Sequence, residues 1–159
     1  MVQQNNNTPA RLFAVQFIYQ VFLKENTNLL SSLESASFDQ INFEALVNDF
    51  VITYQEPDNE HPDASINAYQ IKYGKEVLNN LVQNYPFITK TLESSIKSTV
   101  TSLTPFDRSA LLVGITEMKF LDVPFQVVIN ELVNICKVYG SETSAKFING
   151  VLDGIGKSK

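Results

Sequence analysis

Several features of other protein classes are absent from this sequence. Its 159 residues include one cysteine, Cys136, so no disulfide can form within the chain. No stretch approaches the ~18 consecutive apolar residues of a membrane-spanning helix. Residues 1–9 lack the basic start and the apolar run of a signal peptide. These absences predict a cytoplasmic protein that folds around its own apolar core, without a membrane segment.

Residues that carry catalysis or bind metals are also scarce. The single histidine, His61, lies in the proline- and acid-rich segment 56–63, and no second His or Cys stands near it. A solvated loop histidine is therefore the favoured interpretation over a metal ligand. Cys136 lies among apolar residues with no base beside it, which favours a small buried side chain over a nucleophile. We expect a non-enzymatic protein with no metal and no cofactor.

Charge is distributed unevenly along the chain. There are 17 acidic and 12 basic residues, for a formal net charge of −5. Only Arg11 and Lys24 are basic in the first 60 residues, whereas basic and acidic residues nearly balance from His61 onward. A nucleic-acid surface, if the protein has one, should therefore lie mainly on the second half of the chain.

Apolar residues recur at helical spacing, and no segment alternates like a strand, so the sequence predicts an all-α protein. Tyr85-Pro86 breaks the pattern and predicts a helical subdomain over 9–85 and another over 86–156. The tail 1–8 is expected to be disordered, and 157–159 forms a short tail. We expect six or seven helices. They lie at about 9–23, from a capping box at Ser37 and Gln40 to about 54, from near 64–67 to about 84, and at 88–96, 105–121, 125–138 and 141–152.

Local signals mark where several helices begin and end. Thr8 and Thr104 each precede a proline, as a hydroxyl N-cap precedes proline at a first helical position. Gly140 predicts a left-handed C-cap. Gly74 interrupts a helical pattern, which indicates close packing between helices. The last helix is expected to end before two glycines, Gly154 and Gly156.

Two segments resemble the NusB family. The first is Ala10-Arg-Leu-Phe-Ala-Val-Gln-Phe-Ile-Tyr-Gln20, which is similar to that family's opening helix. The second, over about 105–155, contains Asp122-Val-Pro124, Val128-Ile-Asn-Glu131, Lys137-x-Tyr-Gly140 and Lys146-Phe-Ile-Asn-Gly-Val-Leu-Asp153 in the family's order. The match covers roughly 60 residues, and no motif is recognised over 24–103.

The resemblance implies two packed bundles of three to four helices each. It also implies a transcription antitermination factor that binds boxA-type single-stranded RNA together with the ribosomal protein NusE. Such a factor acts within the RNA polymerase antitermination complex, notably in ribosomal RNA operons.

The family motifs also suggest individual roles. Lys146 would contact phosphate, Phe147 would stack on an unpaired base, and Asn149 would hydrogen-bond a base edge or phosphate. By match to the family, Tyr19 and Asp107 would meet the ribosomal protein, with Asp107 pairing an arginine. Phe147 fits a core position equally well. The full set of expected RNA-binding residues is Arg11, Gln16, Tyr19, Glu142, Ser144, Lys146, Phe147 and Asn149.

One departure from the family concerns charge. NusB proteins commonly carry an arginine-rich stretch before the first helix, whereas here only Arg11 remains beside the uncharged segment 3–9. Fewer phosphate contacts predict weak intrinsic RNA binding that depends on the partner protein. A protein-only adaptor is therefore an alternative function. A domain serving RNA modification is another, although the chain contains no cofactor-binding segment, and an unrelated helical bundle is a third.

Overall fold

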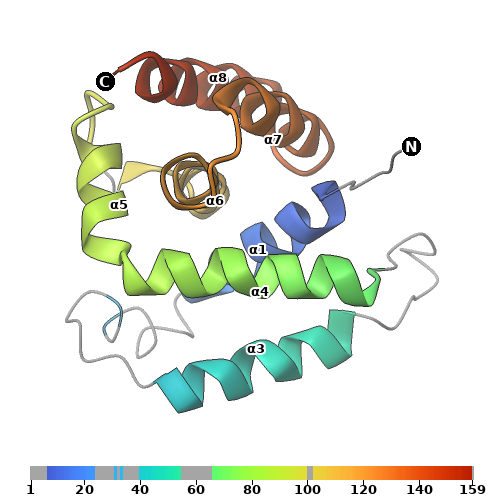
Figure 1. Ribbon diagram of the computed structural model, residues 1–159. Helices are drawn as coiled ribbons and strands as arrows, with labels where there is room; N and C mark the ends of the chain where they lie inside the picture. Colours follow the sequence, from blue (N-terminus) through green and yellow to red (C-terminus); the bar gives the residue numbers. More distant parts are fainter. Residues whose placement is uncertain are drawn as a thin grey trace. The chain divides into compact units, whose positions relative to one another are not determined.

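The computed structural model describes residues 7–23, 31, 33, 40–54, 66–99 and 102–158. Apart from connecting turns, these residues are helical and include no strand, which confirms the predicted all-α class (Figure 1). The expected loop 24–37, the acidic segment 56–63 and His61 lie largely or wholly outside them. The helices are α1 (Thr8–Val21), α3 (Gln40–Tyr54), α4 (Ala68–Gln83), α5 (Tyr85–Glu93), α6 (Pro105–Phe120), α7 (Phe125–Tyr139) and α8 (Glu142–Lys157).

The chain forms two compact units, Met1–Glu76 and Val77–Lys159, which divide within α4. The subdomain boundary expected near residue 85, where Asn84 separates α4 from α5, stays a prediction. Within the described ranges, no helix combines the length and the apolar character needed to cross a membrane.

A cluster of aromatic rings holds the first unit together. Phe17 of α1 meets Phe43 and Phe50 of α3 edge-on, with ring centroids 5.6 and 5.5 Å apart. Phe13 meets Phe50 at 5.3 Å. Such pairs prefer edge-to-face geometry and add to the stabilisation from apolar burial. This cluster explains why the phenylalanine-rich faces of α1 and α3 pack together.

Gly74 allows α4 to approach α1 closely, as the sequence predicted. A β-carbon at this position would lie 2.7 Å from Cδ2 of Phe13 and 3.4 Å from the carbonyl oxygen of Ala10. The absence of a side chain therefore lets the Phe13 ring lie directly against the α4 backbone, within the first unit.

In the second unit, α6 packs against α5, α7 and α8. Every residue from Arg108 to Glu117 is buried, as expected of a helix covered on several sides. Gly114 leaves room for α7 and α8, because its β-carbon would lie 2.8 Å from Leu132 and 3.0 Å from Leu152. The guanidinium of Arg108 donates a hydrogen bond to the hydroxyl of Tyr85 at 3.2 Å, which links α6 to α5.

The turn between α6 and α7 explains the Asp122-Val-Pro124 motif. Asp122 has a φ of 55°, a left-handed conformation that aspartate tolerates better than most residues. The backbone N–H of Val123 then donates to the carbonyl of Glu117 at 3.2 Å. Pro124 precedes the first residue of α7 and has the extended backbone of an N-cap position. The motif is therefore a helix-to-helix turn.

The structure confirms some of the predicted helix ends. The Thr104 hydroxyl accepts a hydrogen bond from the Asp107 N–H at 3.1 Å, as expected of an N-cap. Asn67 and Gln70, which the sequence analysis did not single out, form a reciprocal capping box at the start of α4.

Three predictions about helix ends are wrong. Thr8 lies inside α1, whose N-cap is Asn7. Gly140 has a φ of −105°, so it is not left-handed; the ring of Phe106 lies against it instead. The last helix continues through both glycines to Lys157, because Gly156 packs against Phe125, where a β-carbon would come within 2.3 Å of the ring.

We predict opposite effects for alanine at two neighbouring glycines of α8. Gly156→Ala should lower the free energy of unfolding by about 1–3 kcal/mol, because the methyl group collides with Phe125. Gly154→Ala should raise it by about 0.5–1 kcal/mol, because no atom lies within 4 Å and alanine favours the helix. Chemical denaturation measures both. Equal effects of the two substitutions would contradict the close contact between Gly156 and Phe125.

Candidate RNA and partner surface

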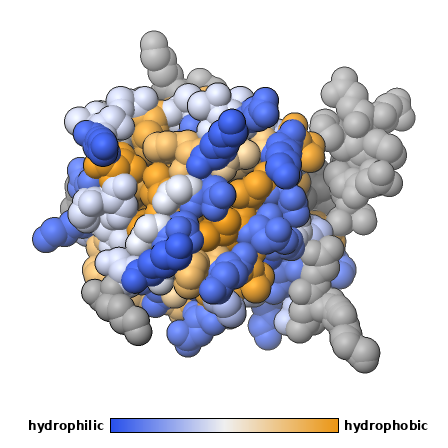
Figure 2. Space-filling model, turned by 90° about the horizontal axis from the view of Figure 1, so that it is seen from above, coloured by the Kyte–Doolittle hydropathy of each residue, from blue (hydrophilic) through white to orange (hydrophobic). Residues whose placement is uncertain are grey.

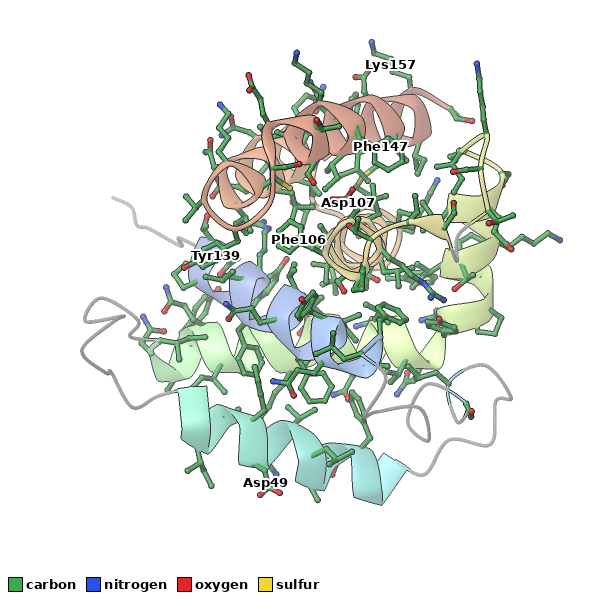
Figure 3. The ribbon with its side chains drawn as sticks, turned by 180° about the vertical axis from the view of Figure 1, so that it is seen from behind. Asp49, Phe106, Asp107, Tyr139, Phe147 and Lys157 are labelled. Carbon is green, nitrogen blue, oxygen red and sulfur yellow. The ribbon has the colours of Figure 1, made fainter. Side chains whose placement is uncertain are left out.

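The candidate surface forms where α6 begins, α7 ends and α8 begins. The start of α6 is placed by the Thr104 cap, and the start of α8 by Ser141, whose hydroxyl accepts from the N–H of Ser144 at 3.0 Å. The contact between Phe106 and Gly140 joins the first of these helix ends to the end of α7. Figure 3 shows Phe106 and Asp107 at the start of α6, with Phe147 on α8 above them.

We call the group Phe106, Asp107, Tyr139, Lys146 and Phe147 the junction surface. Lys146 is exposed, and Phe147 is half-buried. Tyr139 is 45% exposed. The surface thus carries a cation, a carboxylate and aromatic rings that water reaches in part.

Asp107 has an unsatisfied oxygen. Its carboxylate lies in the first turn of α6, where the positive end of the helix dipole favours a negative charge. One carboxylate oxygen, Oδ1, is buried and has no hydrogen-bond partner within the described part of the chain. A buried acceptor without a donor is costly. The residue as a whole is half-buried.

Cys136 lies beneath this surface and is fully buried. Burial, together with the nearby carboxylate of Asp107, raises the pKa of its thiol to about 12. A thiol with so high a pKa carries almost no thiolate near neutral pH, which supports the interpretation of Cys136 as a packing residue.

The other expected RNA-binding residues differ in accessibility. Asn149 and Glu142 are exposed on α8, whereas Ser144 is buried, and its hydroxyl accepts a hydrogen bond from that of Ser141 at 3.1 Å. In the first unit, Tyr19 is 37% exposed and Gln16 is half-buried on the same face of α1. Arg11 is only 3% exposed.

Sequence reasoning did not single out Phe106 and Tyr139 as site residues. Tyr139 lies in the quoted Lys137-x-Tyr-Gly140 motif, which was the one available signal. No sequence motif indicated Phe106. Its place beside the end of α7 follows from its contact with Gly140, which only the three-dimensional structure shows. No group of His, Cys, Asp and Glu suited to hold a metal ion occurs among the described residues.

The described residues build an all-helical fold with a mixed aromatic and charged surface. The family model described as "NusB family" matches residues 8–157. The chain belongs to the NusB family. The match extends over residues 24–103, where no motif was recognised.

Individual relatives agree with this assignment. The chain is 32% identical over 145 residues to the transcription antitermination protein NusB of Cupriavidus pinatubonensis, covering 91% of this chain and 72% of that protein. It is 34% identical over 94 residues to NusB of Mannheimia succiniciproducens, covering 58% of this chain. That second match spans a little under two thirds, 66%, of the relative's length.

Solved structures show the same fold. NusB of T. maritima superposes with a TM-score of 0.68 at 21% identity, covering 98% of this chain and 94% of that one. A chain from a crystal structure of antitermination factors NusB and NusE in complex with double-stranded RNA gives a TM-score of 0.72 at 22% identity, covering 96% of each.

We predict that Cys136 is inert in the folded protein. At pH 8, Ellman's reagent should react with less than about one tenth of the thiol in native protein, and with all of it in guanidinium. Because folding raises the pKa of this thiol, the free energy of unfolding should also fall as the pH rises above 9. Rapid stoichiometric labelling of the native protein would refute this.

Proposed function

We propose that this protein is a transcription antitermination factor that binds boxA-type RNA jointly with the ribosomal protein NusE. The observation that carries the proposal is the junction surface, where an exposed lysine and a partly exposed phenylalanine lie on one turn of α8. Family membership supports the general role, and the fold match to a complex of NusB, NusE and RNA supports the two partners. The protein would act without catalysis, in the cytoplasm, within the RNA polymerase antitermination complex of ribosomal RNA operons.

The chemistry of the α8 residues suits a single RNA strand. Lys146 supplies a positive charge for a phosphate, and the accessible part of the Phe147 ring offers a face on which an unpaired base stacks. Asn149, one turn beyond Lys146 and also exposed, presents an amide that both donates and accepts. Glu142 and Ser144 would shape the start of this helix, Ser144 through its contact with Ser141.

The partner protein would meet Asp107 and Tyr19. A guanidinium or ammonium group that meets the half-buried Asp107 would form a charge-assisted hydrogen bond with its carboxylate. Tyr19 offers an apolar ring with a polar hydroxyl, a combination common at interfaces. Gln16 shares its face of α1 and would contact RNA or partner beside it.

Arg11 would contribute little to phosphate binding. Because it is 3% exposed, we propose that Lys146 carries most of the cationic contact. Intrinsic RNA affinity would then be weak, with a shallow dependence on salt, and NusE would supply much of the binding.

We predict that two lysines of α8 differ in their importance for RNA binding. In the presence of NusE, Lys146→Ala should weaken boxA binding and reduce the slope of log affinity against log salt by about 0.7. Lys157→Ala is the matched control, because Lys157 pairs with Asp153 at 3.0 Å near the other end of α8. Fluorescence anisotropy at several salt concentrations measures both. Equal slopes for parent and Lys146→Ala would remove Lys146 from the site.

Stacking predicts a separate result for Phe147. Phe147→Ala should cost about 1–3 kcal/mol of RNA binding, whereas Phe147→Tyr should keep most of it, because the ring face persists. Unchanged binding by Phe147→Ala, with unchanged thermal stability, would assign this ring to packing alone.

For the partner contact, Asp107→Asn should weaken NusE binding at least about tenfold, because the amide loses the charge that holds a cationic donor. Asp153→Asn is the control, since its carboxylate faces Lys157 on α8. Isothermal titration calorimetry without RNA measures both. Equal affinity of the two variants would place the partner elsewhere.

The burial of Arg11 also favours a second candidate, a protein-only adaptor with faded RNA binding. In that case NusE binding would persist, while boxA and scrambled RNA would bind equally even with NusE present. Sequence-specific binding would eliminate the adaptor.

A further inference from the structure

One aromatic ring joins the start of α6 to the turn between α7 and α8. The ring of Phe106 lies against Gly140, where a β-carbon would come 2.8 Å from Cε2 and 3.2 Å from Cδ2 of the ring. Gly140 is the C-cap of α7, and its backbone N–H donates to the carbonyl of Cys136 at 2.8 Å. The ring therefore packs on the backbone at the point where α7 ends.

The turn on which this ring packs also begins α8. Ser141 follows Gly140 directly and is the N-cap of α8. Its hydroxyl accepts a hydrogen bond from the N–H of Ser144 at 3.0 Å, which closes the first turn of the helix. Lys146 and Phe147 lie in the next turn of the same helix. The position of the turn therefore sets the position of the α8 residues that are proposed to bind RNA.

The turn and its flanks are open to water. Every residue from Lys137 to Thr143 is exposed. Figure 2 looks onto the side of α7 and α8 and shows hydrophobic residues among hydrophilic ones. A stretch of backbone with few buried contacts opens readily, so the ring of Phe106 has a large share in holding this turn in place.

The first turn of α6 carries the proposed partner contact as well as this ring. Asp107 follows Phe106 directly, and its backbone N–H donates to the capping hydroxyl of Thr104 at 3.1 Å. A partner that pairs with the Asp107 carboxylate would restrain this first turn, and with it the Phe106 ring. Binding that orders one site lowers the entropic cost of binding at a second site that shares the ordered segment.

We propose that Phe106 is a positioning residue that couples the partner contact to the RNA contact. Binding of NusE at Asp107 fixes the ring, the ring fixes the turn at Gly140, and α8 then binds RNA at a lower entropic cost. The inference rests on the proposed function, because NusE and RNA are its two ligands. Such coupling is reciprocal, so RNA strengthens NusE binding by the same factor.

A thermodynamic cycle on the full chain tests the proposal. Fluorescence anisotropy gives the affinity for a boxA oligoribonucleotide with and without saturating NusE, and the ratio of the two affinities is the coupling factor. We expect a factor of about 5–150 for the parent and a factor at least about threefold smaller for Phe106→Ala. Phe125→Ala is the matched control, because it also removes a ring that packs on a glycine, Gly156, but at the opposite end of α7. It should keep the parental factor.

Alanine at two glycines tests the contact from its other side. Gly140→Ala places a methyl group 2.8 Å from the Phe106 ring and pushes the ring off the turn, so it should lower the coupling factor as Phe106→Ala does. Gly154→Ala has no atom within 4 Å of its methyl group and should keep the parental factor. A merely structural role of Phe106 would lower the thermal stability of Phe106→Ala and leave the factor unchanged.

Amide hydrogen exchange supplies a readout that needs no RNA. NusE binding to the parent should slow exchange at Gly140 and Ser144 at least about threefold, because a fixed ring lowers the frequency with which the turn opens. The same amides in Phe106→Ala should exchange at similar rates with and without NusE.

The outcomes separate this proposal from the proposed function. Equal coupling factors in the parent and in Phe106→Ala would overturn the positioning role and leave joint binding of NusE and RNA intact. Exchange at Gly140 and Ser144 that NusE does not slow in the parent would also overturn it. A tenfold loss of NusE affinity in Phe106→Ala without RNA would make Phe106 part of the partner contact instead. A parent protein with no coupling at all would refute joint binding as well.

Discussion

The close approach of α7 and α8 to α6 is the constraint on which the second unit depends. Gly114 permits it, because any side chain there would meet Leu132 and Leu152. Gly156 permits a second close contact, between α8 and Phe125 of α7. These contacts hold α8 in place over its whole length to Lys157, and with it the residues proposed to bind RNA.

The same packing gives the junction surface its mixed character. The apolar faces of α6, α7 and α8 all end at this surface. Ring edges and polar groups therefore meet there, at the boundary of the core. Two contacts belong to this boundary. The Phe106 ring lies against Gly140, and the Asp107 carboxylate lies near the thiol of Cys136. An aromatic ring half-covered by core is held in one orientation, which lowers the entropic cost of stacking on a base.

Much of the fold could be predicted from the sequence, because helical periodicity and caps are local. The helices were placed correctly in type and order, and Thr104 and Gly74 were interpreted correctly. Errors arose where tertiary contacts override local signals. Gly156 was taken as a helix end because its partner, Phe125, lies 31 positions away in the sequence. Gly140 was taken as a left-handed cap because the sequence does not show that the ring of Phe106 packs against it. The burial of Arg11 and Ser144 was likewise invisible, since burial depends on neighbours from other helices.

An NMR titration of isotope-labelled protein with boxA RNA and unlabelled NusE tests the central claim most directly. We predict that RNA added to a mixture of this protein and NusE shifts the amide signals of α8 around residues 146–149 and of Phe106 and Tyr139, while signals of α3 stay in place. Scrambled RNA should produce smaller shifts. Shifts confined to other helices, or equal shifts with both RNAs, would contradict the assignment of the junction surface to sequence-specific RNA binding.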